Sequence, residues 1–180
     1  MKAVLDACVL YPTVLREILI GAAKAGLYTP LWSDRILEEW ARATVKLGPG
    51  AELVARGEVA RLRVAFPHAS VPVHKGIVAR LWLPDPNDVH VLAAAIGGHA
   101  DLIITFNAAD FPRHTLAEEG IRREDPDRLL LDFWQDAPDK VAQVVEAVRA
   151  EAERLSGQPQ PLRALLKRAS LPRLGKALTR

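Results

Sequence analysis

The sequence predicts an α/β fold with a central parallel sheet, followed by a helical C-terminal extension. Short apolar runs typical of buried strands alternate with amphipathic helical patterns, which favours parallel strands joined by right-handed crossovers. After Gln135 the pattern becomes wholly helical. The composition, 49% hydrophobic and 26% charged over 180 residues, excludes a disordered or collagen-like chain. We therefore expect a first domain at residues 1–135 and the extension at residues 136–180.

The first half should contain two strands and three helices. Asp6 ends the first apolar run, Ser33 can cap a helix that carries Trp40, and Pro72 weakens the second strand. In chain order, we expect a strand at 3–5, a helix over 14–22, an extended connector at 27–32, a helix from Ser33 to Gly48, a helix at 52–65 and a short strand at 71–73.

The second half contains clearer signals for where helices begin and end. Asp85 and Pro86 combine an N-cap with a proline at the first helical position. On the helix that follows, Asp88 shares the apolar face and should point inward, whereas His90 should point outward. We expect this helix to end at Gly97-Gly98, followed by a strand at 101–105, a helical turn at 116–119, a short strand around Ile121, a closing segment at 128–134, and helices at 138–155 and 162–169.

Four acids stand at positions where a structural role does not fully account for them: Asp6, Glu39, Asp88 and Asp110. Each has a plain alternative, since Asp6 can cap a helical turn, Asp88 can favour a helix dipole and Asp110 can form a turn. Glu39 flanks the apolar stripe of its helix, whereas Glu38 points away from that stripe into solvent.

Taken together, these acids favour a metal site. Several of them belong near the carboxyl edge of a parallel sheet, where ligands bind in such folds. Carboxylates gathered there repel one another unless a cation or protons neutralise them, and oxygen ligands suit hard divalent ions. Metal-assisted hydrolysis follows, and other chemistries lack support. The sequence has no glycine-rich phosphate loop, no paired histidines of the zinc-protease kind and one cysteine, Cys8, without a neighbouring histidine.

With these residues in view, the chain resembles the PIN-domain nucleases, and within them the VapC-like toxins of toxin–antitoxin pairs. The resemblance covers about residues 1–134 and implies an α/β/α sandwich. The matching segments are VLDACVLYP at 4–12, WSDRILEE at 32–39, PDPNDVHVLAAA at 84–95, ADLIITFN at 100–107 and DFP at 110–112.

The resemblance implies a metal site formed by Asp6, Glu39 and Asp88, with Asp110 in the fourth acidic role. Either Asn107 or Asp110 faces the metal, and Asp85 can hold a ligand in place from behind. Thr105 supports the site together with Asn107.

The resemblance also implies a Mg²⁺- or Mn²⁺-dependent endoribonuclease that cuts single-stranded RNA. Such a nuclease would be inhibited by a cognate antitoxin and could form a homodimer. Two alternatives remain open at this point. One is a housekeeping RNA-processing nuclease, and the other is a PIN-like module that binds RNA or protein without catalysis. Since no membrane span or signal peptide is evident, we expect a cytoplasmic protein without membrane partners.

The positive charge of the chain is concentrated at its end. Residues 157–180 hold six basic residues and no acid, which leaves 18 basic and 22 acidic residues in 1–156. Arg163, Lys167 and Arg168 are candidates for contacts with RNA phosphates, although a solvated helix face explains them equally well. The tryptophans could stack on bases, but core packing is expected for all four: Trp32, Trp40, Trp82 and Trp134.

Overall fold

The computed structural model describes residues 1–179 and divides the chain into two compact units. The first, here called the sheet unit, comprises residues 1–11 and 29–124. The second, here called the helical unit, comprises residues 12–28 and the segment from Asp125 onward. The domain boundary proposed between residues 135 and 136 falls inside the helical unit and stays a prediction. Arg180, the last basic residue of the chain, lies outside the described residues.

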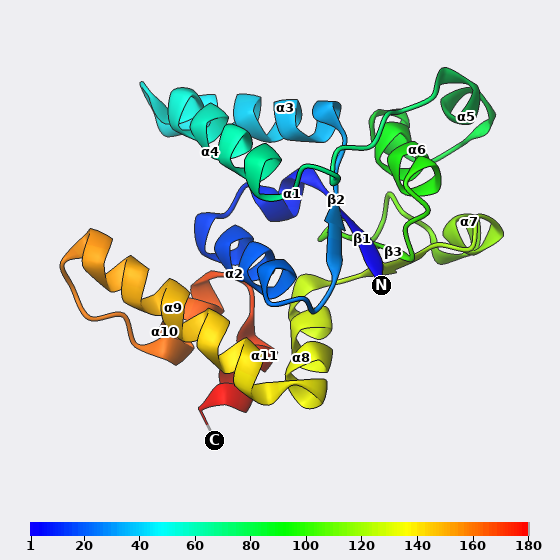
Figure 1. Cartoon of the computed structure of the whole chain (residues 1–180). Coiled ribbons are helices and arrows are strands. Elements are labelled where there is room, and N and C mark those ends of the chain that lie inside the picture. The colour runs from blue at the N-terminus through cyan, green and yellow to red at the C-terminus, as the bar shows by residue number, and fades with distance from the viewer. Residues whose placement is uncertain (180) are drawn as a thin grey trace. The chain divides into compact units, whose positions relative to one another are not determined.

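A four-stranded parallel sheet organises the sheet unit (Figure 1). The strand order is β2-β1-β3-β4, and Val4 at the centre of β1 pairs with Leu31 of β2 and Ile103 of β3. The strands are β1 (Lys2–Leu5), β2 (Thr29–Leu31), β3 (Leu102–Ile104) and β4 (Arg122–Glu124). The expected α/β fold with a parallel sheet and additional C-terminal helices is confirmed.

Two local expectations about strands are wrong. Residues 27–32, expected as a connector, contain β2, because three residues can complete a ladder when a buried strand such as β1 lies beside them. The strand expected at 71–73 does not form. The nearest pairing is an isolated bridge between Trp32 and Ser70, and Pro72 lacks the N–H group that a continuing ladder would need.

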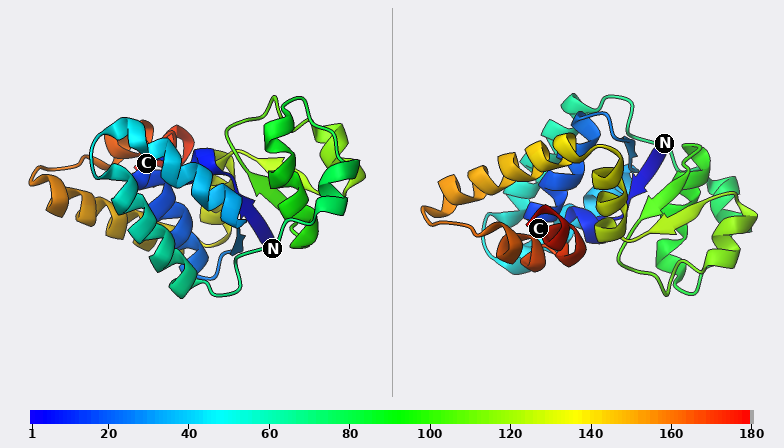
Figure 2. Two further views of the ribbon diagram at one scale, coloured as in Figure 1. Left: turned by 90° about the horizontal axis from the view of Figure 1, so that it is seen from above. Right: turned by 90° about the horizontal axis from the view of Figure 1, so that it is seen from below.

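The helices of the sheet unit include α5, which the pattern did not predict, and α1, the helical turn that the alternative role of Asp6 allowed. Asp6 stands at the N-cap of α1, but its side chain makes no capping hydrogen bond. The expected cap of α3 is present, since the Ser33 hydroxyl accepts a hydrogen bond from the Ile36 amide at 3.2 Å. Helix α6 packs against β1 and β3, and Figure 2 shows α5, α6 and α7 on the side of the sheet unit where β3 and β4 lie. The elements are α1 (Ala7–Leu10), α3 (Asp34–Ala43), the 3-10 helix η1 (Thr44–Leu47), α4 (Ala51–Ala65), α5 (Lys75–Arg80), the 3-10 helix η2 (Pro86–Asp88), α6 (Val89–Gly97) and α7 (Arg113–Glu118).

As far as residue 179, five helices form the helical unit, and α11 among them was not predicted. Helix α9 packs against α2 and α8, while α11 packs against α8 and α10. The backbones of α2 and α9 approach closely at Gly21, where an added Cβ would lie 2.6 Å from Val144 Cγ1. The helices are α2 (Thr13–Lys24), α8 (Pro126–Asp136), α9 (Pro138–Ser156), α10 (Leu162–Arg168) and α11 (Pro172–Leu178).

The basic end of the chain therefore belongs to a packed unit. Leu165, Leu166, Leu171 and Leu174 are buried within it. No helix among residues 1–179 is long and apolar enough to cross a membrane.

Core packing holds for two of the tryptophans and fails for a third. Trp32 and Trp40 are buried, but the side chain of Trp82 is 68% exposed, so the expectation of core packing is wrong there. Trp82 follows the end of α5, in a segment without regular secondary structure.

Candidate metal centre

Asp6 stands directly after β1, at the carboxyl end of a central strand. Its amide donates to the carbonyl of Ile104 at 3.1 Å, which ties it to the end of β3. The side chain is only 6% exposed. Its Oδ2 atom accepts hydrogen bonds from the Thr105 hydroxyl at 2.7 Å and from the Cys8 thiol at 3.2 Å. Thr105 thus orients Asp6, and Cys8 takes part in the same cluster, which the sequence did not suggest.

The Cys8 thiol is half-buried and stays protonated. Burial and the nearby charge of Asp6 raise the pKa of the thiol to about 12. Because the thiolate is the nucleophilic form of cysteine, this environment argues against covalent catalysis by Cys8.

Asp88 lies where η2 passes into α6. Its Oδ2 atom accepts a hydrogen bond from Nδ2 of the Asn107 side chain at 3.1 Å. Three residues earlier, Asp85 caps η2 by accepting from the Asn87 amide at 2.8 Å. The expected N-cap is therefore present, and Asn107 contacts an acid of the candidate site through its amide group.

The structure brings three acids closest together: Asp85, Asp88 and Asp110. Each offers a carboxylate oxygen, and these oxygens all lie within 4.8 Å of one another. Asp85 was expected to support the metal ligands without binding the metal itself. Its carboxylate nevertheless belongs to this group of three acids. Asp6 and Glu39 are not part of this group of three.

Asp6 and Glu39 nevertheless act on the same carboxyl group. The pKa of Asp88 is raised to about 6, first by burial and then by the charges of Asp6, Asp85, Asp110 and Glu39. Asp88 is thus the point at which all four acids singled out in the sequence interact.

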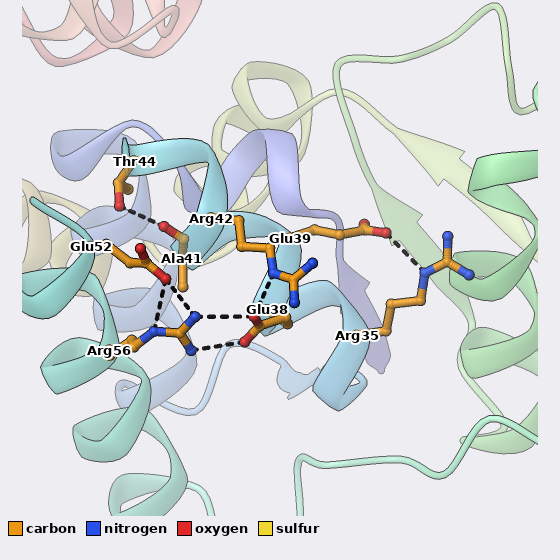
Figure 3. Close-up of polar contacts among 8 residues, drawn as sticks. All are labelled: Arg35, Glu38, Glu39, Ala41, Arg42, Thr44, Glu52 and Arg56. Atoms are coloured by element: carbon orange, nitrogen blue, oxygen red, sulfur yellow. Dashed lines mark hydrogen bonds and ion pairs between the residues drawn. The ribbon is translucent and has the colours of Figure 1, made fainter. Parts of the chain in front are cut away.

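Glu39 reaches this region from α3, and Figure 3 shows its side chain directed away from that of Glu38. Oε1 of Glu39 accepts a hydrogen bond from Arg35 Nε at 2.9 Å. Burial raises the pKa of Glu39, Arg35 opposes that shift, and the charge of Asp6 adds to it. Glu38 instead pairs with Arg42 at 2.6 Å and Arg56 at 2.8 Å, so the expectation of a surface role for Glu38 is confirmed.

His90 is buried, and the expectation that it points outward is wrong. Its side chain is 3% exposed. All residues of α6 from Val89 to Ala95 are buried, so this part of the helix has no face in contact with solvent. Nε2 lies 3.0 Å from Oε1 of Glu39. Burial, helped by the charge of Arg35, lowers the pKa of His90 to about 4, so the ring is neutral at pH 7.

The donor set fits a divalent cation. Five carboxylates contribute to the region, and within residues 1–179 Glu39 alone among them pairs with an arginine. After burial, the charges of the other four acids contribute to the raised pKa of Asp88. A hard cation with oxygen ligands would relieve this repulsion.

A family model described as the PIN domain matches residues 2–109. This range contains Asp6, Glu39, Asp85, Asp88 and Asn107, and it ends one residue before Asp110. No curated protein and no solved structure shows significant similarity to the chain.

Proposed function

Because the chain belongs to the PIN-domain family, whose members are generally metal-dependent nucleases, we propose that it is a divalent-metal-dependent endoribonuclease that hydrolyses RNA phosphodiester bonds. The observation that carries this proposal is the convergence of Asp85, Asp88 and Asp110, whose carboxylate oxygens lie within 4.8 Å of one another. The charges of Asp6 and Glu39 also act on Asp88. Such a cluster disfavours folding when no cation is bound, so its presence points to a function.

In this proposal Asp6, Glu39, Asp88 and Asp110 hold Mg²⁺ or Mn²⁺. A divalent ion supplies two things when bound: it lowers the pKa of a water molecule and stabilises negative charge on the phosphate under attack. Asp85 is a further oxygen donor, since its carboxylate belongs to the tightest acidic group.

The remaining polar residues hold the acids in place. Thr105 and Cys8 donate to the same oxygen of Asp6, which restricts rotation of that carboxylate. The side-chain amide of Asn107 restrains Asp88 in the same manner. The backbone amide of Asn107 donates to the Thr105 hydroxyl at 2.9 Å. The two restraints therefore belong to one hydrogen-bonded segment at the end of β3.

The direct test removes single charges from the site. Asp6→Asn and Asp88→Asn should each reduce cleavage of single-stranded RNA more than about 100-fold, since even partners of metal ligands contribute 10- to 100-fold. Both variants should keep their far-ultraviolet circular dichroism spectrum. Glu38→Gln, on the same helix as Glu39 but paired with surface arginines, is the matched control and should cleave normally. Wild-type cleavage rates in both aspartate variants would refute the proposal.

We further propose that the nuclease is the toxin of a toxin–antitoxin pair, acting on RNA in the cytoplasm and inhibited by a cognate antitoxin. The resemblance of the Asp6, Asp88 and Thr105–Asn107 segments to VapC-like proteins supports this role. Expression of the wild-type chain alone should arrest growth, and expression of Asp6→Asn should not. Growth without arrest, together with cleavage in vitro, would favour the housekeeping RNA-processing role.

A further inference from the structure

We propose that His90 is a nitrogen ligand of this metal centre, binding beside Glu39 and raising the affinity of the site for Mn²⁺ relative to Mg²⁺. The inference rests on the metal site of the proposed function and adds a ligand that the acidic pattern does not contain. It starts from a buried ring with no hydrogen-bond partner.

The imidazole of His90 is almost completely buried, with 3% of the side chain exposed. Within residues 1–179, neither Nδ1 nor Nε2 has a hydrogen-bond partner. Leaving such a polar group unsatisfied is unfavourable, and native proteins seldom do so without a reason. A leucine would fill the same space without that cost, so packing alone does not explain a histidine here.

The spacing between His90 and Glu39 fits two ligands of one ion. Nε2 of His90 lies 3.0 Å from Oε1 of Glu39, within hydrogen-bond distance, yet neither ring nitrogen forms a hydrogen bond within residues 1–179. Neighbouring ligands of an octahedral ion, each about 2.1 Å from the metal and at a right angle, lie about 3.0 Å apart. In such an arrangement His90 and Glu39 would each supply one ligand atom to the same ion.

The surroundings of His90 place it with the acids. Glu39 Oε1 lies 3.0 Å from the ring, and Asp6 and Arg35 lie close enough to act on it electrostatically. Arg35 contacts Glu39, so it competes with a metal ion for that carboxylate. A bound cation would displace this contact or share the carboxylate through its second oxygen.

The chemistry of the ligand predicts a change in metal preference. Mg²⁺ favours oxygen ligands, whereas imidazole suits transition metals. Loss of His90 should therefore weaken binding of Mn²⁺ more than binding of Mg²⁺. A residue that only supports the fold would affect both ions alike.

The experiment uses the metal-free full-length chain, titrated with Mn²⁺ and separately with Mg²⁺ in a calorimeter. We expect His90→Leu to weaken Mn²⁺ binding about tenfold or more and Mg²⁺ binding less than about threefold. His68→Leu, at an exposed histidine of the same unit, is the matched control and should bind both ions like the wild type. Equal losses for both ions, or no loss for either, would overturn the inference.

A second measurement needs no variant. Pulsed electron paramagnetic resonance of the Mn²⁺-loaded wild type should show coupling of the manganese to a ¹⁴N nucleus. Bound Mn²⁺ with oxygen ligands only would contradict the role of His90, even if RNA cleavage is normal. Nitrogen coupling without RNA cleavage would instead support the ligand and refute the nuclease, so the two failures are distinguishable.

Discussion

Asp88 is a carboxyl group whose charged form is disfavoured by burial and by the acids around it. It is half-buried, it accepts a hydrogen bond from Asn107, and four other acids act on it. Without a cation, each of these acids disfavours the charged form of Asp88. The stability of the metal-free chain should therefore depend on the protonation of this residue.

The sign of that pH dependence follows from the direction of the pKa shift. Folding raises the pKa of Asp88 from about 3.8 to about 6, so the folded chain holds more protons than the unfolded chain between those pH values. The contribution of Asp88 to stability is full below pH 4 and is lost as the pH rises through 6. Asp88→Asn should remove this loss and stabilise the metal-free protein at pH 7, by on the order of 1 kcal/mol after allowance for solvent screening.

Urea unfolding in the presence of a chelator, at pH 4.5 and pH 7, measures this effect. Glu38→Gln provides a control of opposite sign, because Arg56 and Arg42 lower the pKa of Glu38 and removal of its charge should give no gain at pH 7. An Asp88→Asn variant that is less stable than the wild type at pH 7 would contradict the expected repulsion.

At the level of elements, helix ends in the two units depend on single side chains. In the helical unit, the buried Asp127 of α8 accepts hydrogen bonds from the Arg173 amide at 2.9 Å and the Leu174 amide at 3.0 Å. These amides belong to the first turn of α11, which has no partner for them within the helix. Asp127 therefore joins α8 to α11.

Asp127→Ala should destabilise the helical unit by about 1–3 kcal/mol, because it leaves two buried or half-buried amides without an acceptor. Hydrogen exchange should accelerate in α11, and binding of divalent ions to the sheet unit should not change. Asp132→Ala, on the same helix but in an exposed pair with Arg128, should cost less than about 1 kcal/mol. Equal costs for the two variants would show that the cap does not stabilise α11.

Short elements are also where the sequence was least informative. The seven residues of α11 and the three of β2 are too few to show a periodic pattern. They form because a neighbour supplies what they lack: Asp127 caps α11, and β1 offers its free edge to β2.

At the scale of the whole molecule, the basic C-terminal segment is part of the helical unit. Deleting residues 157–180 would remove the buried Leu165 and Leu166 together with the charges, so it would not isolate an electrostatic effect. Substituting the charges alone is the sharper test. Arg163, Lys167 and Arg168 lie on α10.

Replacing Arg163, Lys167 and Arg168 by Gln should flatten the dependence of RNA affinity on salt. Each lost phosphate contact with a single strand reduces the slope of log K against log[salt] by about 0.7, or about 2 for all three. Filter binding of single-stranded RNA at several salt concentrations measures this slope. Arg149→Gln with Arg154→Gln, whose charges are paired with glutamates of α9, is the control. If the triple variant keeps the wild-type slope, α10 does not contact RNA.

The sequence by itself determined the parallel α/β fold, most of the helices and the set of acids worth examining. It could do so because hydrophobic periodicity and helix caps are local, and Asp6 and Asp88 each stand at the end of a recognisable element. Only the tertiary structure decided that Asp110 joins Asp85 and Asp88, that His90 is buried, and that its ring lies 3.0 Å from Glu39. Those facts depend on which segments meet in space, and the pairing of distant segments leaves no periodic trace in the residues that take part.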